Sequence, residues 1–248
     1  TMEKNIFSGF RDESLEILNG NLHFTNLAER KKDYIEVKEE AKIRDGMPEI
    51  GRILKSDFSV GETYRQISGE KAIVSGAIYY HILYISDEAE PVPVFFQGKV
   101  DFTQFIRLED GENFTGCDIF MTIDDIRVVA KADEDENMTI FDLSVGVSTK
   151  LDLFREQSAQ VVEDAYHSKK VVDIEREVME CNLRKGSGSV DALMKETIGL
   201  PAGAESISQI IYLCGEAFGA GGEIEKDRAV IEGVLEARII YSSGENGG

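Results

Sequence analysis

The stretch "AIVSGAIYYHILYIS" (Ala72–Ser86) decides the fold class, because its alternate residues fall into two sets of different polarity. Alternate residues of a β-strand lie on the same face of a sheet, so this period predicts a strand. One of the two faces carries only apolar residues and a glycine: Val74, Gly76, Ile78, Tyr80, Ile82 and Tyr84. We expect that face to be buried. The glycine in mid-strand indicates a bulge, a bend or the close approach of a neighbouring backbone.

A similar strand occurs again as "AVIEGVLEARIIYSS" at Ala229–Ser243. The two copies align without a gap when Gly76 is placed on Gly233, an offset of 157 positions, and the match extends upstream to Gly46 and Gly203. An ungapped match over about 45 residues indicates a duplicated domain. We therefore predict that 41–87 and 198–244 share one fold. We expect the second unit to be incomplete, because its key strand is followed by few residues.

The segments between the two copies also read as strands. Apolar residues alternate with polar or small ones in four further segments: Phe95–Leu108, Cys117–Ile123, Ile126–Ala132 and Phe141–Leu153. The acidic stretch "DEDEN" (Asp133–Asn137) reads as a turn between the last two. Several strands joined by acidic turns predict a mainly β protein, an antiparallel β-sandwich or open barrel, repeated as two units.

Short helices and domain boundaries complete the predicted architecture. Pro48 suits a first helical turn, and the spacing of the isoleucines and leucine in "MPEIGRIL" (Met47–Leu54) is helical. Ser187–Gly199 is a second candidate helix. The predicted divisions are a lead segment at 1–40, a first β domain at 41–170 and a second, partial unit at 171–248.

Composition and charge narrow the class of partner. The chain has 248 residues with 47 acidic and 27 basic side chains, a net charge of -20, which repels phosphate backbones and anionic lipid. No apolar run approaches the roughly 20 residues of a membrane span, and the first residues lack the pattern of a secretory signal. The three cysteines are far apart, as is usual for reduced thiols inside a cell. We expect neither nucleic-acid binding nor membrane insertion.

No group of residues has the spacing of a catalytic or metal site. Each of the three histidines, His23, His81 and His167, lacks a second histidine or cysteine three or four positions away. The cysteines lack a CxxC pattern. The acidic stretch Asp133–Asn137 lacks the length and glycine of an EF-hand loop, so the sequence favours a solvated turn. Weak calcium binding by its carboxylates is the alternative. The sequence therefore predicts no enzyme, no cofactor and no metal.

Three motifs resemble the SPOCS domain of clostridial spore-coat proteins. They are "IRDGMPEIGRIL", "GEKAIVSGAIYYHILYISDE" and "VDFTQFIRL", and "VVEDAY" (Val161–Tyr166) is similar to the segment that closes such a unit. The resemblance covers about 41–170 and, more weakly, 171–244. Within the family, the resemblance is to SipL-type coat morphogenetic proteins, although this sequence has no LysM module like theirs. It implies a structural scaffold of the endospore coat, located in the mother-cell cytoplasm at the forespore surface. The implied partners are other coat morphogenetic proteins, and self-association is open.

Aromatic residues on the more polar strand faces are the candidate interaction surface. Tyr79, Phe95 and Phe105 occupy positions where a fully solvated strand would carry polar residues. The alternative is that a second sheet or a loop covers them. A carbohydrate- or peptidoglycan-binding β module is the competing function, although the chain contains no tryptophan to stack on a sugar. An enzyme whose site is assembled from residues distant in sequence is a further alternative that stays open.

Overall fold

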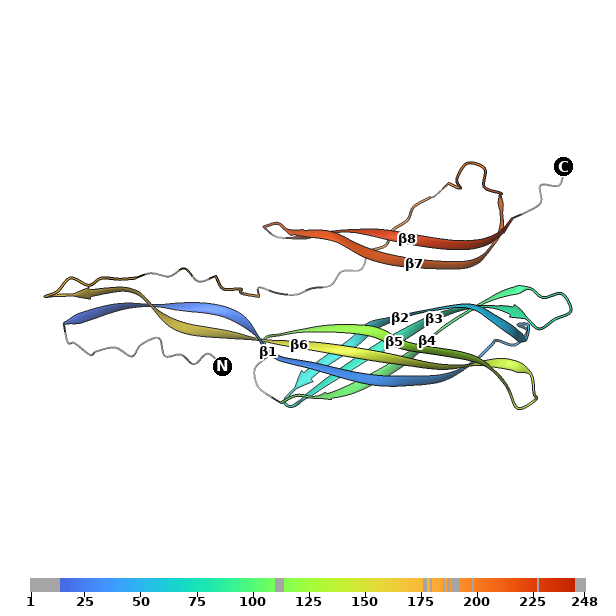
Figure 1. Ribbon diagram of the computed structural model, residues 1–248, viewed down its shortest axis with the longest axis horizontal. Helices are drawn as coiled ribbons and strands as arrows, with labels where there is room; N and C mark the ends of the chain where they lie inside the picture. The colour runs from blue at the N-terminus through green and yellow to red at the C-terminus, as the bar shows by residue number, and fades with distance from the viewer. Residues whose placement is uncertain are drawn as a thin grey trace.

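The computed structural model describes residues 14–109, 114–175, 178, 180–184, 186, 188, 192–197, 199–226 and 228–243. These residues form three antiparallel sheets and no helix (Figure 1). The first sheet has the order β1 (Leu15–Lys42), β6 (Met138–His167), β5 (Gly116–Ala132). The second has the order β2 (Ile50–Ser68), β3 (Lys71–Ser86), β4 (Pro93–Arg107). The third is a hairpin of β7 (Ile207–Ile224) and β8 (Ala229–Ser243). The expectation of a mainly antiparallel β protein is confirmed.

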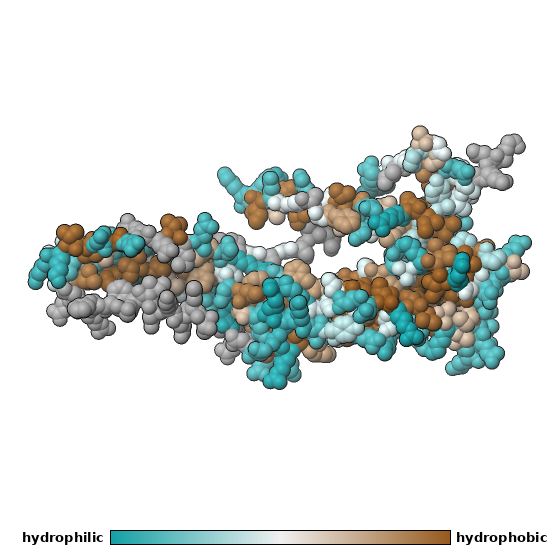
Figure 2. Space-filling model, in the orientation of Figure 1, coloured by the Kyte–Doolittle hydropathy of each residue, from teal (hydrophilic) through white to brown (hydrophobic). Residues whose placement is uncertain are grey.

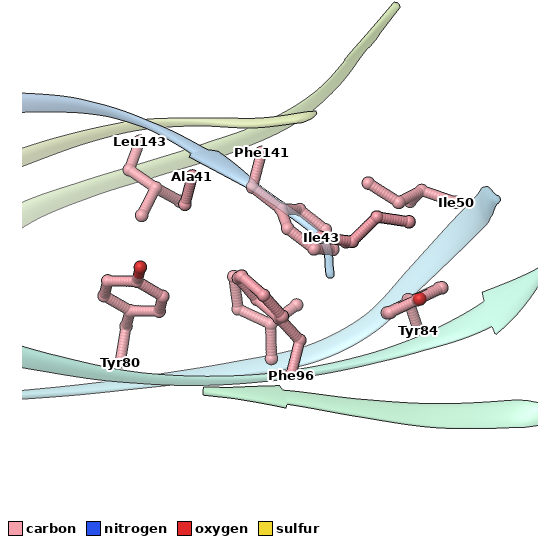
Figure 3. Close-up of a cluster of buried hydrophobic side chains, with 9 residues drawn as sticks. Ala41, Ile43, Ile50, Tyr80, Tyr84, Phe96, Phe141 and Leu143 are labelled. Atoms are coloured by element: carbon pink, nitrogen blue, oxygen red, sulfur yellow. The ribbon is translucent and has the colours of Figure 1, made fainter. Parts of the chain in front are cut away.

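The two three-stranded sheets share their apolar clusters. In the largest cluster, Phe141 and Leu143 of β6 and Ala41 of β1 pack with Tyr80 and Ile82 of β3 (Figure 3). A second cluster joins β3 and β4 to β6 through Val74, Ile106, Leu151 and Leu153, and a third does so through Ile78, Phe102, Val145 and Val147. Burying one such side chain stabilises the fold by about 1.5–3 kcal/mol. The core therefore lies between the facing sides of these two sheets.

The predicted buried face of β3 is confirmed. None of its large side chains exceeds 5% exposure, and Ile78, Ile82 and Tyr84 are fully buried. On β6, the alternating apolar residues from Phe141 to Leu153 are equally buried. A period of two along both strands places these residues on the facing sides of the sheets. The alternation read from the sequence is thus the alternation of the core.

The mid-strand glycine makes room for an aromatic ring of the next strand. Gly76 lies directly opposite Phe102 of β4, and a Cβ atom at Gly76 would lie 2.6 Å from the Cζ atom of that ring. The same arrangement occurs in reverse four residues along, where Tyr80 of β3 lies opposite Gly98 of β4. A Cβ atom at Gly98 would clash with the Tyr80 hydroxyl oxygen. Of the alternatives raised by the sequence, close approach of a neighbouring strand is the one that applies.

Both predicted helices are wrong. β2 begins at Ile50, and a bulge between Ile50 and Arg52 inserts one extra residue into the strand. The bulge brings Ile50 and Ile53 to the same side of the sheet, since a spacing of three across a bulge replaces the usual spacing of two. This strand geometry imitates the spacing of a helix. In Ser187–Gly199, the described residues have no regular secondary structure.

The described part of the predicted lead segment is a strand of the first sheet. β1 pairs antiparallel with β6 along its length, from Leu15 opposite His167 to Lys42 opposite Ile140. β5 covers only part of β6, since its first residue, Gly116, lies opposite Phe154. Beyond that point β1 and β6 continue as a two-stranded ribbon (Figure 1). The first unit therefore draws on residues before 41.

The hairpins β2–β3 and β7–β8 have the same pairing register when the numbers are shifted by 157. Ile50 lies opposite Ser86, and Ile207 lies opposite Ser243. The three register shifts of β2, at 50/52, 53/55 and 62/64, recur in β7 at 207/209, 210/212 and 219/221. A bulge changes the direction of the side chains around it. Because the bulges occur at the same three places, equivalent residues of the two hairpins have the same strand geometry.

The turns that precede the two hairpins also agree. Gly46 and Gly203 both have φ in the left-handed region, at 86° and 89°, which favours glycine. The Tyr84 hydroxyl donates a hydrogen bond to the carbonyl oxygen of Pro48 at 2.9 Å. At the equivalent positions, the Tyr241 hydroxyl donates to the carbonyl oxygen of Glu205 at 3.4 Å. The equivalence thus includes a turn, a tyrosine and its acceptor.

Candidate interaction surface

The outer face of the β2–β3–β4 sheet, the side opposite the core, carries the aromatic residues that the sequence singled out. Tyr79 lies in the middle of β3, between Ser59 of β2 and Lys99 of β4. Phe105 lies near the end of β4, opposite Ile73. Tyr79 is 44% exposed and Phe105 is 72% exposed. Among the residues that the structure describes, no second sheet covers either side chain.

Phe95 has a different environment, because the β7–β8 hairpin covers it. Its ring lies 5.5 Å from the ring of Tyr212, at 85° to it, in an edge-to-face contact. Tyr212 is only 2% exposed, and its hydroxyl donates a hydrogen bond to the Asp57 carboxylate. The Lys55 ammonium lies over the same ring, 4.6 Å from its centre. Such aromatic and cation–π contacts each contribute about 0.5–1.5 kcal/mol, so Tyr212 anchors the hairpin here.

The three predicted residues therefore do not form one patch. Phe95 belongs to the contact between the hairpin and the β2–β3–β4 sheet, where hydrophobic side chains gather at one end of the molecule (Figure 2). Tyr79 and Phe105 stay exposed on the rest of the outer face. The rows of these two residues are six positions apart along β3, or about 20 Å at the usual rise per residue.

Tyr64 is a further exposed aromatic residue on this face, and sequence reasoning missed it. It lies opposite Ser75, two positions along β3 from the residue opposite Phe105, and is 52% exposed. Its hydroxyl donates a hydrogen bond to the Gln66 side-chain oxygen at 2.9 Å. The stretch around Tyr64 reads as a connection rather than a strand, because the bulge between Glu62 and Tyr64 breaks the alternation. The outer face therefore presents Tyr64, Phe105 and Tyr79 among small and charged residues.

The structure shows the surroundings of several titratable side chains that the sequence analysis considered. The described residues contain no group of three or more histidine, cysteine, aspartate or glutamate side chains arranged to hold a metal ion. His81 packs against the Phe95 ring at 5.7 Å between ring centres, and the His167 Nδ1 atom accepts a hydrogen bond from the Lys169 backbone N–H at 2.9 Å. Burial raises the pKa of the Cys117 thiol to about 11. At neutral pH this thiol is therefore protonated and a poor nucleophile.

The acidic stretch 133–137 forms the turn between β5 and β6. The Asp133 carboxylate accepts hydrogen bonds from the backbone N–H groups of Asp135 and Asn137, each at 3.1 Å, and from the Thr139 hydroxyl at 2.8 Å. These donors, with the Thr139 hydroxyl contributing most, hold the pKa of Asp133 below its usual value. Its carboxylate therefore helps to hold the turn.

Comparison with known proteins identifies the region that carries this surface. Residues 49–131 match the family model described as "SipL, SPOCS domain". The match spans β2, β3 and β4 and ends one residue before the end of β5. No curated protein and no solved structure matches the chain. The described residues contain no helix with the length and apolar composition of a membrane span.

The matched range contains the two strand motifs and the second half of the first motif from which the resemblance was drawn, whereas "VVEDAY" (Val161–Tyr166) lies outside it. "MPEIGRIL" forms the turn and the start of β2, the long apolar strand is β3, and "VDFTQFIR" is the second half of β4. The outer face with Tyr64, Tyr79 and Phe105 lies wholly within it. The resemblance to the SPOCS domain is therefore confirmed over residues 49–131.

Proposed function

We propose that this protein is a structural component of the bacterial endospore coat, a scaffold in coat assembly or attachment. The match of residues 49–131 to the SPOCS domain carries the proposal, since that family is associated with sporulation and the spore coat. The proposed location is the mother-cell side of the forespore surface, and the proposed partners are other coat morphogenetic proteins.

The exposed aromatic residues supply the contact that a scaffold needs. We infer that the two larger sheets are the layers of a sandwich, which holds the outer face rigid from behind. Three aromatic side chains on this face are exposed: Tyr64, Tyr79 and Phe105. They would lose little conformational entropy on binding a partner, because aromatic side chains have few rotatable bonds. Aromatic residues are enriched at the centres of protein interfaces, where each buries a large apolar area. The outer face is therefore the proposed contact with a coat partner.

The charge of the chain supports a protein partner over a nucleic acid or a lipid surface. A net charge of -20 opposes binding to phosphate groups. A peptidoglycan-binding module is the alternative, and its sites stack sugars on aromatic rings in a concave patch. Here the rows of Tyr79 and Phe105 lie about 20 Å apart along a strand, and the chain contains no tryptophan.

Deletion of the gene in a spore-forming host tests this function. We expect a detached or mislocalised coat, visible by electron microscopy of the spores, which the wild-type gene restores. A Tyr79→Ser, Phe105→Ser double variant should fail to restore it. A Phe120→Ser variant is the matched control, because Phe120 is 52% exposed on β5, away from the outer face.

The outcomes separate the proposed classes. A normal coat together with altered cell-wall turnover would contradict the scaffold and support the peptidoglycan module. A double variant that restores the coat fully, at wild-type abundance, would show that the outer face is not the contact. Thermal unfolding of each purified variant shows that any failure is not a failure to fold.

A further inference from the structure

The outward side of the β1–β6–β5 sheet carries charged residues in rows that run across its three strands. A row consists of residues that lie directly opposite one another, and successive rows on one side of a sheet lie about 7 Å apart. The sign of the charge alternates along four successive rows, which we call the striped face. The first row is Glu36–Gly146–Asp125, the second Lys38–Ser144–Arg127, the third Glu40–Asp142–Val129 and the fourth Lys42–Ile140–Lys131.

In the part of the chain that the structure describes, the striped face is open to solvent. The charged side chains that β1 contributes to it, and that of Lys131, are between 48% and 67% exposed. The β7–β8 hairpin packs on the far side of the molecule, against Phe95 of the β2–β3–β4 sheet. The striped face is therefore available to a partner.

The rows attract their neighbours and cancel one another's charge. Glu40 and Asp142 lie directly opposite each other in the third row, and like charges in this arrangement destabilise an antiparallel pair. Lys131 of the fourth row forms an ion pair with Glu40, and Lys38 of the second row forms one with Glu36 of the first at 3.1 Å. The four rows hold four acidic and four basic side chains, so this face is neutral on a chain with a net charge of -20. A second copy meets no net negative surface here.

We propose that the striped face binds the striped face of a second copy, about a two-fold axis that runs across the strands between the second and third rows. Read from its other end, the order of the four rows exchanges every acidic row for a basic one, so the face is complementary to itself. β1 then lies over β1 of the second copy. Glu36 faces Lys42 of the second copy, Lys38 faces Glu40 of the second copy, and the symmetry forms each pair twice.

The other two strands fit the same axis. On β5, Asp125 faces Lys131 of the second copy. On β6, the Asp142 carboxylate faces the Ser144 hydroxyl of the second copy, which can donate a hydrogen bond to it. Each exposed ion pair contributes little, so the dimer depends on several of them together and should form in a concentration-dependent way.

An aromatic ring and a hollow also come together in this arrangement. The Tyr34 side chain is 52% exposed and lies over Gly146, where a Cβ atom would be 2.9 Å from a carbon of its ring. The axis places Gly146 over Ile140 of the second copy. Ile140 lines a hollow of about 520 Å³ between the fourth row and the acidic turn Asp133–Asp135. The Tyr34 ring of each copy would therefore enter the hollow of the other and bury apolar surface there.

Other two-fold axes oppose like charges. An axis through the second row places Lys38 opposite itself, and an axis through the third row does the same with Glu40. An axis between the first and second rows brings Lys42 over Lys32 of the second copy. An axis along the strands places every row on its own copy. Among these arrangements, only the axis between the second and third rows gives all four rows an opposite charge.

Zero-length crosslinking of the full chain tests the arrangement. A carbodiimide joins a carboxylate directly to an amine, so it links only groups in contact. Within one copy, Glu36 and Lys42 are six residues apart on one strand, or about 20 Å, as are Asp125 and Lys131. A Glu36–Lys42 link found by mass spectrometry therefore joins two copies, and the Lys38–Glu36 link within one copy is the internal control.

The crosslinked dimer should contain the Glu36–Lys42 link, and an equal mixture of unlabelled and ¹⁵N-labelled chains should give it in mixed-isotope form. A dimer that contains the internal control link but neither Glu36–Lys42 nor Asp125–Lys131 would overturn the arrangement. This pairing does not depend on the proposed coat function.

Charge reversal with sedimentation velocity tests the same contact without a covalent bond. The wild-type chain should show a concentration-dependent dimer. Lys38→Glu and Glu40→Lys, each alone, place like charges opposite one another twice and should weaken dimerisation about tenfold. The double variant Lys38→Glu, Glu40→Lys restores opposite charges across the axis and should recover the dimer.

Lys32→Glu is the matched control. It changes the net charge as much as Lys38→Glu does, on the same side of the same strand, but it lies outside the four rows. It should change dimerisation by less than about twofold. Thermal unfolding of each variant shows that the fold is kept. A wild-type chain that is monomeric at all concentrations, a double variant as weak as the single ones, or equal effects of Lys32→Glu and Lys38→Glu would refute the proposal.

Discussion

Removing the side chain of Ile82 should destabilise the protein far more than removing that of its neighbour His81. Ile82 is fully buried in the cluster that β3 shares with β1 and β6, whereas His81 lies on the outer face against Phe95. Ile82→Ala removes three carbon atoms, or about 2.4 kcal/mol of transfer free energy. The cavity adds to this, because strands on both sides hold the site open, and the total falls at about 3–4 kcal/mol.

Thermal unfolding followed by circular dichroism measures the difference. For a protein of this size, 1 kcal/mol lowers the Tm by about 2–4 °C, so Ile82→Ala should lower it by about 6–16 °C. His81→Ala removes a half-buried ring from the outer face and should lower the Tm by less than about 4 °C. Equal shifts for the two variants, or a smaller shift for Ile82→Ala, would refute the assignment of faces on β3.

Three further predictions concern side chains outside that core. The Arg184 guanidinium donates hydrogen bonds to the Asp118 carboxylate at 2.8 and 2.6 Å and lies 4.8 Å from the Phe154 ring centre, so it ties the segment between β6 and β7 to the first sheet. Arg184→Ala should therefore speed limited proteolysis of that segment without changing the Tm of the larger sheets. Cys181 is exposed, whereas burial raises the pKa of Cys117 to about 11, so a thiol reagent at pH 7.5 should modify Cys181 well before Cys117, and equal rates in the folded protein would contradict this. Hydrogen bonds from Arg30, and to a lesser extent from Lys150, hold the pKa of Asp152 below its usual value. The stability that this gives is complete above the unfolded pKa of about 3.9 and is lost as the pH falls through the lower folded pKa. Asp152→Asn should therefore make the Tm fall less steeply as the pH is lowered in the acid range.

The strands that face the core were predictable because burial on one side imposes a period of two. On β3 and β6, the residues that alternate in the sequence are those that alternate between core and outer face. The apolar face of β4 was found in the same way, although it includes a polar exception. Gln104 is 3% exposed on that face and accepts a hydrogen bond from the Thr149 hydroxyl at 2.5 Å, a pairing between distant strands that one sequence cannot reveal.

The elements that were missed lack a clean period for physical reasons. At the start of β2, a bulge turns the strand's spacing of two into three, which reads as helical at Ile50 and Ile53. The first half of β1 belongs to a two-stranded ribbon, and no third strand or second sheet among the described residues covers it. Few of its residues are therefore buried, and no apolar face stands out. Of the candidate surface, the sequence placed Tyr79 and Phe105 on the correct side of the sheet. The cover over Phe95 depends on where a hairpin more than 100 residues later packs, which local patterns do not encode.

The outer face of the SPOCS-containing sheet is the proposed attachment of this protein to the assembling coat. The measurement that tests it most directly is the position of a fluorescent fusion in sporulating cells. The wild-type fusion and the Phe120→Ser control should form a ring around the forespore, while the Tyr79→Ser, Phe105→Ser fusion should spread through the mother cell at equal abundance. A wild-type fusion that stays diffuse throughout sporulation, or a double variant that forms the same ring as the wild type, would contradict the account.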